Sequence, residues 1–304
     1  MTSEPRYAAA YNDSNVLFRV LRHVGWGDLV NVGYFTLPTL PIAVTGLGWF
    51  QRRLLRRSLS LLDVHQGQRV LDAGCGRGLG TAWLARRGCE VLGVDVEPDQ
   101  VQQARHRFGD QLNARFAVAD VTALPARVAD VALADESFDR VHCLEAAFHF
   151  GPEGRRAFLT EAFRLLRPGG RLVLVDFTWP EPDPGTINGL DPHRLVRDTW
   201  RFEELEPLDR YLDNAVRTGF IVHAVHDWTR PVVRRPLQHA TLVTHIVSTA
   251  VGRTMLRLRW PGLRELNRQD WRAVTDRIRA MRAVGAKCGY SALVLDKPAC
   301  PEPA

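Results

Sequence analysis

Lysine is scarce in this chain of 304 residues. Lys287 and Lys297 are the only two, so the net charge of +6 comes almost wholly from arginine. No basic tract is interleaved with aromatic residues in the manner of a nucleic-acid-binding groove. The charge pattern therefore argues against nucleic acid as a substrate. With 45% hydrophobic and 24% charged residues, the composition is typical of a globular protein that can bury a core.

Cysteine is also scarce, and its positions show no metal-ligand spacing. The odd total of five argues against a disulfide framework. His223 and His226 lie three residues apart on an expected strand, so their side chains point to opposite faces. We therefore expect no metal site and a reducing, cytoplasmic environment.

The sequence has no long hydrophobic run. Its longest apolar stretch, residues 37–50, has 14 residues with two prolines and two glycines, which is too short to cross a bilayer. The first residues are polar and include Glu4 and Asp13, so no secretory signal is expected. The arginines after the apolar stretch leave two interpretations open, a solvated helix flank and a peripheral membrane contact. They are Arg52, Arg53, Arg56 and Arg57.

The chain is organised around a glycine-rich stretch. Val70-Leu71 is typical of a buried strand, alternating glycines follow, and a helical pattern resumes at Leu79. A strand, a glycine turn and a helix bring backbone N–H groups close to a ligand. Dinucleotide-binding domains use such a turn too, so a nicotinamide-dependent oxidoreductase is one interpretation. Two acids favour another: Asp72 precedes the first glycine, and Asp95 ends the next apolar run.

The run Asp72-Ala73-Gly74-Cys75-Gly76-Arg77-Gly78, followed by Gly93-Val94-Asp95, resembles the first two motifs of the class I S-adenosylmethionine (SAM) dependent methyltransferases. The resemblance implies SAM as cofactor and S-adenosylhomocysteine as product. It implies that Asp72 helps to hold the ammonium end of SAM, through water or backbone, and that Asp95 accepts both ribose hydroxyls. The other cofactor contacts that it implies are Gly74, Cys75, Gly76, Gly78, Val96, Glu145 and Ala146.

Two more positions match this family. Asp120 ends an expected strand over residues 116–120 and would accept the adenine amino group, while the N–H of Val121 would bond a ring nitrogen. Gly33-Tyr34-Phe35 resembles a segment that, in small-molecule members, folds over the methionine end of SAM and the substrate. Plain alternatives stay open for both, a surface acid at Asp120 and a packing role for Tyr34.

Strands alternating with helices predict an α/β fold, a Rossmann-like seven-stranded sheet that is mostly parallel with the last strand antiparallel. We expect the N-terminal helices and the inserted lid to cover the carboxyl edge of the sheet, where ligands bind. The expected segments are an N-terminal helical cap (1–62), a SAM-binding core (63–180), a loop, helix and sixth strand (181–230), a helical lid (231–286), and the last strand with a tail (287–304).

Two residues are expected at the reacting groups. His149 follows the fourth strand and Asp176 ends the fifth, so both strand tips face one crevice. The sugar and natural-product O-methyltransferases that this chain resembles use a His and an Asp at these positions around the acceptor hydroxyl. His149 as a base and His149 as a pocket-lining residue both remain open. An unperturbed histidine base would make the rate rise with pH near about 6.5.

The acceptor itself is only loosely indicated. Tryptophans outside the core motifs lean toward a lipophilic acceptor, and filling an ordinary core is the other interpretation of them. The resemblance favours methylation of a small natural product on oxygen, and carbon or nitrogen stays open. A SAM-binding protein that transfers no methyl group, such as a cyclase, is the main alternative. A homo-oligomer is left open.

Overall fold

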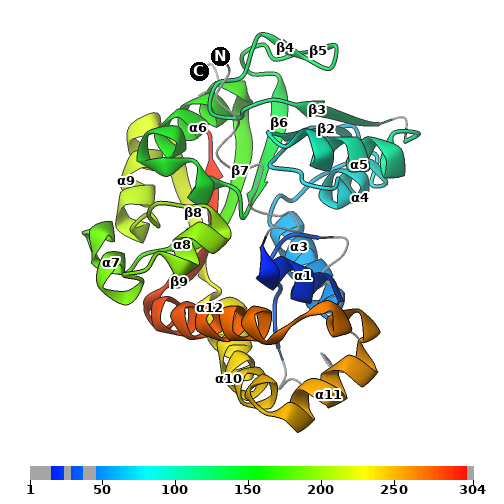
Figure 1. Cartoon of the computed structure of the whole chain (residues 1–304). Helices are drawn as coiled ribbons and strands as arrows, with labels where there is room; N and C mark the ends of the chain where they lie inside the picture. Colours follow the sequence, from blue (N-terminus) through cyan, green and yellow to red (C-terminus); the bar gives the residue numbers. More distant parts are fainter. Residues whose placement is uncertain (1–14, 24–28, 37–45, 112, 300–304) are drawn as a thin grey trace, which may run out of the picture.

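The computed structural model describes residues 15–23, 29–36, 46–111 and 113–299. At its centre lies a seven-stranded sheet in the order β3-β2-β1-β6-β7-β9-β8 (Figure 1). Neighbours from β3 to β7 pair in parallel, while β9 is antiparallel to both β7 and β8. The mostly parallel, seven-stranded sheet expected from the sequence is therefore confirmed.

The sheet strands are mostly buried, apart from the edge strand β8, because helices cover both faces of the sheet. They are β1 (Arg69–Ala73), β2 (Glu90–Asp95), β3 (Ala114–Val118), β6 (Phe138–Leu144), β7 (Leu166–Thr178), β8 (Ile221–Asp227) and β9 (Gly289–Asp296). Two further strands, β4 (Arg127–Val128) and β5 (Val131–Ala132), form a separate hairpin that the sequence did not predict.

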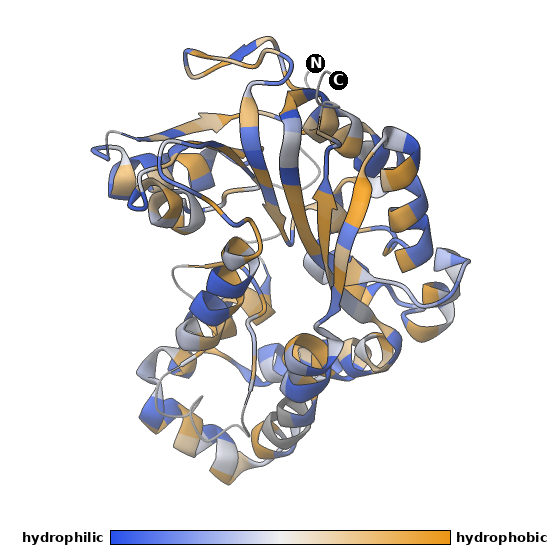
Figure 2. Cartoon of the chain, turned by 180° about the vertical axis from the view of Figure 1, so that it is seen from behind, coloured by the Kyte–Doolittle hydropathy of each residue, from blue (hydrophilic) through white to orange (hydrophobic). Residues whose placement is uncertain are grey.

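Two apolar clusters fill the two faces of the sheet. One packs α6 (Gly151–Leu165) and α9 (Leu208–Thr218) against the strands. The other packs α3 (Gly48–Ser60), α4 (Leu79–Ala85) and α5 (Pro98–Phe108). Figure 2 shows the central strands as largely apolar ribbons between helices whose outer faces are polar. This arrangement leaves the carboxyl ends of β1, β2 and β6 as the edge where a ligand can enter.

Three boundaries differ from the sequence prediction. The strand β3 ends at Val118, two residues before Asp120, because the Asp120 carboxylate accepts hydrogen bonds from the backbone N–H and hydroxyl of Thr122 and so starts a turn. The run Arg167-Pro168-Gly169-Gly170 predicts a turn between a helix and a strand, but these residues lie within β7, where the register against β6 shifts. The predicted loop after β7 contains two short helices, α7 (Ile187–Leu190) and α8 (Leu195–Trp200).

An extended segment precedes α3, and we call residues 29–35 the strap. The Tyr34 N–H donates to the Phe50 carbonyl, and the Phe35 N–H donates to the Pro231 carbonyl. The strap therefore joins the N-terminal helices to the block that precedes β9. Most of the apolar stretch 37–50 lies outside the described residues, but the arginine flank of α3 is described: the Arg57 guanidinium lies 4.5 Å from the Tyr34 ring centroid. At least part of this basic flank therefore packs against protein.

The block between β8 and β9 is helical, as expected. It comprises η3 (Arg230–Arg234), α10 (Arg235–Ser248), α11 (Ala250–Arg259), η4 (Pro261–Glu265) and α12 (Arg268–Lys287). α10 and α11 are separated at Thr249, whose side chain accepts from the Gly252 N–H and caps α11. The last helix begins at a capping box between Asn267 and Asp270. α1 (Val16–His23) packs against this block. Within the described ranges, no helix has the length and apolarity needed to cross a bilayer.

Candidate active site

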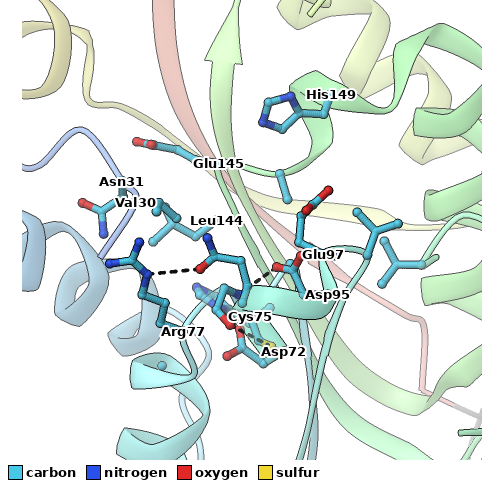
Figure 3. Close-up of a pocket in the computed structure, with 18 of the residues that line it drawn as sticks. Val30, Asn31, Asp72, Cys75, Arg77, Asp95, Glu97, Leu144, Glu145 and His149 are labelled. Atoms are coloured by element: carbon cyan, nitrogen blue, oxygen red, sulfur yellow. Dashed lines mark hydrogen bonds and ion pairs between the residues drawn. The ribbon is translucent and has the colours of Figure 1, made fainter. Parts of the chain in front are cut away.

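A cavity lies at the carboxyl edge of the sheet, between the glycine turn after β1 and the strap. Its volume is about 1220 Å³ including the part open to solvent, above the roughly 300–1,000 Å³ typical of small-molecule sites. In Figure 3, Asp72, Cys75 and Asp95 lie on one side, and Glu145 and His149 lie across from them. The strap contributes Leu29, Val30 and Asn31. The cavity thus joins the strap to residues at the carboxyl ends of the parallel strands.

Backbone hydrogen bonds fix the position of the glycine turn after β1. The N–H groups of Gly74 and Cys75 both donate to the Val94 carbonyl, which ties the turn to β2. Gly74 has φ +72°, and a Cβ there would lie 2.5 Å from the Ala146 Cβ. At Gly76, with φ +52°, the nearest atom to an added Cβ is Val30 Cγ2 at 3.6 Å. Glycine is therefore required by packing at Gly74, whereas space is left open at Gly76.

Asp95 faces the cavity from the end of β2. Its Oδ2 accepts from the Gly76 N–H at 2.8 Å, and its Oδ1 accepts from the Glu97 N–H at 3.0 Å. Burial raises the pKa of this carboxyl, while the two backbone donors act against that rise. Each carboxylate oxygen keeps a second lone pair, so Asp95 can still accept from two hydroxyl groups.

Asp72 belongs to a buried hydrogen-bonded chain. Its Oδ2 accepts from the Thr81 hydroxyl at 2.7 Å, and its Oδ1 lies 2.8 Å from His142 Nδ1. His142 Nε2 in turn lies 3.0 Å from Ser58 Oγ on α3. Both Asp72 and His142 line the cavity, since β1 and β6 pair them in register. Asp72 is thus fixed by neighbours, which fits a ligand contact through water or backbone better than a direct one.

Glu145 connects the sheet to the strap. Its Oε1 accepts from the Tyr290 hydroxyl at 2.6 Å, and its Oε2 accepts from the Val32 N–H at 3.0 Å. Burial raises the pKa of Glu145 to about 8, so the carboxyl is largely protonated at neutral pH. Its backbone has φ 51°, a strained value for a non-glycine residue. The strap is therefore closed over the cavity through a strained, mostly neutral acid.

His149 ends the short helix η1 (Ala147–His149), directly after β6. Its Nδ1 lies 3.0 Å from the Arg201 carbonyl, which can only accept, so Nδ1 carries the proton. Burial lowers the pKa of His149 to about 4, so the ring is neutral at physiological pH. The neutral tautomer leaves the lone pair on Nε2. A cavity-lining imidazole in this form can accept a proton.

Four further predicted site residues line the cavity, namely Val96, Asp120, Val121 and Ala146. Three predicted site residues do not line it. Gly78, at φ +79°, begins α4, where an added Cβ would meet Phe116. Tyr34 packs edge-on against Trp228. Asp176 is buried beneath the site, where its Oδ2 accepts from the Tyr211 hydroxyl and burial raises its pKa to about 7. Direct roles for these three stay predictions.

The cavity wall also contains polar residues that the sequence did not single out, namely Asn31, Arg77, Glu97, Gln100 and His142. Asn31 donates through Nδ2 to the Gln51 carbonyl, and Gln51 donates back to the Asn31 carbonyl. The Oδ1 atom of Asn31 is buried and has no hydrogen-bond donor within the described part of the chain. Only the position of Asn31, three residues before Tyr34, could have suggested it from sequence.

The comparisons with known proteins agree with this geometry. A methyltransferase domain family matches residues 70–170. The methyltransferase GfsG of Streptomyces halstedii is 37% identical over 55% of this chain and 55% of its own length. An O-methyltransferase of Pyrenophora dematioidea is 32% identical, over 64% of this chain and 68% of its own length.

The chain belongs to the class I SAM-dependent methyltransferases. The 2-methyl-6-phytyl-1,4-hydroquinone methyltransferase of Synechocystis is 29% identical over 68% of this chain. This methyltransferase spans only 55% of GfsG and 64% of the hydroquinone enzyme. The family membership sets aside the nicotinamide-dependent oxidoreductase interpretation.

Solved structures show the same fold at low identity. The [4+2]-cyclase SpnF is 20% identical with a TM-score of 0.66, covering 97% of this methyltransferase and 98% of SpnF. Geranyl diphosphate C-methyltransferase from Streptomyces coelicolor, solved with Mg²⁺, a substrate analogue and S-adenosylhomocysteine, is 16% identical with a TM-score of 0.67, covering 97% and 99%.

The cavity of this methyltransferase fits the family's cofactor. Its wall holds five carboxyl groups and one guanidinium, Arg77, a balance that favours a cationic ligand even with Glu145 protonated. The Asn31 Oδ1 atom, buried without a donor, suits an ammonium group. Asp95, at the opposite wall, keeps acceptor capacity for a diol. SAM carries all three features: a sulfonium, an ammonium and a ribose diol.

Proposed function

We propose that this protein transfers the methyl group of SAM to a hydroxyl oxygen of a small, lipophilic acceptor. The observation that carries the proposal is that His149, neutral and with its lone pair on Nε2, lines the same cavity as the glycine turn and Asp95. SAM, when bound, supplies a methyl group on a positively charged sulfur. The acceptor therefore needs alignment and loss of its proton more than further activation.

The core side of the cavity would hold the cofactor. Asp95 would accept from the ribose hydroxyls, Asp120 and Val121 would meet the adenine, and Asn31 would accept from the ammonium group. Asp72 would act through water or backbone, because its carboxylate is almost fully buried and is held by Thr81 and His142. The strap, fastened at Glu145, would exclude water from this end of the cavity.

His149 would act on the acceptor side. Its Nε2 would take the proton of the acceptor hydroxyl as that oxygen gains the methyl group that SAM would supply. The Arg201 carbonyl fixes the ring by accepting from Nδ1, and this carbonyl also stabilises the imidazolium that forms. A pKa of about 4 in the resting protein keeps His149 ready as a neutral base across the physiological range.

Apolar side chains in the cavity wall support a lipophilic acceptor. Leu144 and Phe150 line the cavity close to His149 in the sequence, and Val30 and Leu55 line it as well. The names of two relatives agree, an O-methyltransferase and a methyltransferase of a phytyl-substituted hydroquinone.

We retain a cytoplasmic location in the proposal, because all four cysteines that the structure describes are free thiols.

A mass-balance assay tests the proposal. The protein is incubated with SAM and a set of alkylated phenols and hydroquinones, and both S-adenosylhomocysteine and acceptor mass are followed. We expect the two products in equal amounts, with the acceptor heavier by one CH₂ group and methylated on oxygen. An acceptor converted without change of mass, and without S-adenosylhomocysteine, would support the non-transferring, cyclase-type alternative and overturn the proposal.

A further inference from the structure

Helix α11 exposes an apolar stripe at the far end of the molecule from the sheet (Figure 1). Val251, Met255 and Leu258 are 71%, 64% and 69% exposed. They are four and three residues apart, which places them on one face of the helix. The opposite face is anchored, since Gly252 is buried and Leu256 packs against the cluster formed with α1 and α12. The stripe is therefore displayed outward by a helix that is fixed from behind.

The charge around the stripe has one sign. Residues 228–264 contain seven arginines and no Asp or Glu. Arg253 and Arg257 lie on the anchored face of the helix, where they donate to backbone carbonyls of Val247, Ser248 and Leu266. Arg259, four residues after Met255, and Arg264, on the adjoining η4, are exposed and supply the positive charge near the stripe. The first acid beyond the segment is Glu265, which pairs with His23.

We infer that α11 docks on an anionic lipid bilayer, with Val251, Met255 and Leu258 inserted among the acyl chains and the exposed Arg259 and Arg264 facing the phosphate headgroups. Charge complementarity favours this occupant over a second copy of the chain, because two copies packed through this stripe would bring arginines against arginines. This inference concerns location and goes beyond the proposed function. It does not require methyl transfer.

Vesicle sedimentation tests the docking. The full chain is mixed with vesicles of phosphatidylcholine alone, or of equal parts phosphatidylcholine and phosphatidylglycerol, at low and high salt. We expect binding only to the anionic vesicles, weakened by salt. The triple variant Val251→Ser, Met255→Ser, Leu258→Ser should lose about tenfold or more of its partition coefficient.

A matched control triple, Val216→Ser, Ile221→Ser, Val225→Ser, alters apolar side chains of 58%, 56% and 40% exposure on α9 and β8. It should bind vesicles as the wild type does. Failure of the wild type to bind anionic vesicles, or equal loss in both triples, would overturn the inference. So would a wild-type dimer that the α11 triple converts to monomer, because the stripe would then be an interface between copies.

A second measurement needs no variant. Peroxide oxidises exposed methionine to the sulfoxide, which peptide mass spectrometry quantifies. Anionic vesicles should slow oxidation of Met255 several-fold and leave Met281, on α12, unchanged. Equal oxidation rates of Met255 with and without anionic vesicles would contradict the docking even if the triple variant fails to fold.

Discussion

The two walls of the cavity are built in different ways. The core wall uses Gly74, Cys75, Asp95 and Asp120, which lie at the ends of consecutive strands in the first half of the sheet. The opposite wall joins the strap, Glu145 and His149, whose hydrogen-bond partners come from β9 and from the chain beyond α8. The core wall is fixed by local geometry, and the other by long-range contacts. We propose that the first holds the adenosine part of SAM, and that the second meets its ammonium end through Asn31 and shapes acceptor binding through His149.

The largest expected effect comes from filling the open space at Gly76. Gly76→Val should reduce SAM affinity by more than about a hundredfold, because the side chain would enter the cavity and the residue has positive φ. Gly67→Val is the matched control: Gly67 has φ +83° and nothing within 4 Å of an added Cβ, so it shares the backbone strain without touching the cavity. Calorimetry of both variants measures the SAM affinity. Normal affinity in Gly76→Val would show that the glycine turn does not contact the cofactor.

The second expected effect tests the closure of the strap. Glu145 has a folded pKa of about 8, above its ordinary value of 4.5, so the fold is favoured while the carboxyl is protonated. The stabilisation is fully present below about pH 4.5 and is lost as pH rises toward 8. The size, discounted for partial solvent access, is on the order of 2–4 kcal/mol.

Glu145→Gln keeps an acceptor for the Val32 N–H and removes the titration. Between about pH 5 and about pH 8.5, the free energy of unfolding of Glu145→Gln should therefore fall less than that of the wild type. Urea denaturation of both proteins at each pH measures this. Identical pH dependence in both proteins would show that Glu145 does not titrate in this range.

A smaller effect should follow from changing Asp95 in the core wall. Asp95→Asn should weaken SAM binding by about 1.5–3 kcal/mol, the range for hydrogen bonds to a charged group. Asp139→Asn is a useful control, since Asp139 accepts from the Arg69 N–H at the other end of the same strands. Unchanged SAM affinity in a folded Asp95→Asn protein would remove Asp95 from the ribose site.

The contrast between the two walls also explains what could be predicted from the sequence. The glycine turn, Asp72 and Asp95 are close in sequence, and adjacent parallel strands bring their ends together. His142 was missed because a histidine inside an apolar run does not reveal that it faces Asp72 across two paired strands. The segment with Gly33, Tyr34 and Phe35 was expected over the cofactor, but in the strap it is Asn31 that lines the cavity, whereas Tyr34 packs on Trp228.

Long-range partners were beyond sequence reasoning. The Tyr290 hydroxyl reaches Glu145 from the last strand. The Arg201 carbonyl, which fixes His149, directly follows the short helix α8, and the sequence did not predict that helix. Asp176 was expected at the end of its strand, but β7 continues to Thr178, and the Asp176 carboxylate accepts from the Tyr211 hydroxyl and does not line the cavity. An acid at a strand tip can face either side of the sheet, and only the packing decides which.

Single-turnover kinetics of the wild type, His149→Ala and Asp176→Asn test the proposed chemistry most directly. Each protein is saturated with SAM and mixed with an acceptor found in the mass-balance assay. His149→Ala should slow the chemical step by about a hundredfold at unchanged SAM affinity, and Asp176→Asn should slow it only a few-fold. Because His149 has a pKa of about 4, its contribution should be constant from about pH 5.5 to about pH 9, instead of rising near 6.5. A near-normal rate in His149→Ala would contradict the account and leave alignment as the whole of the catalysis.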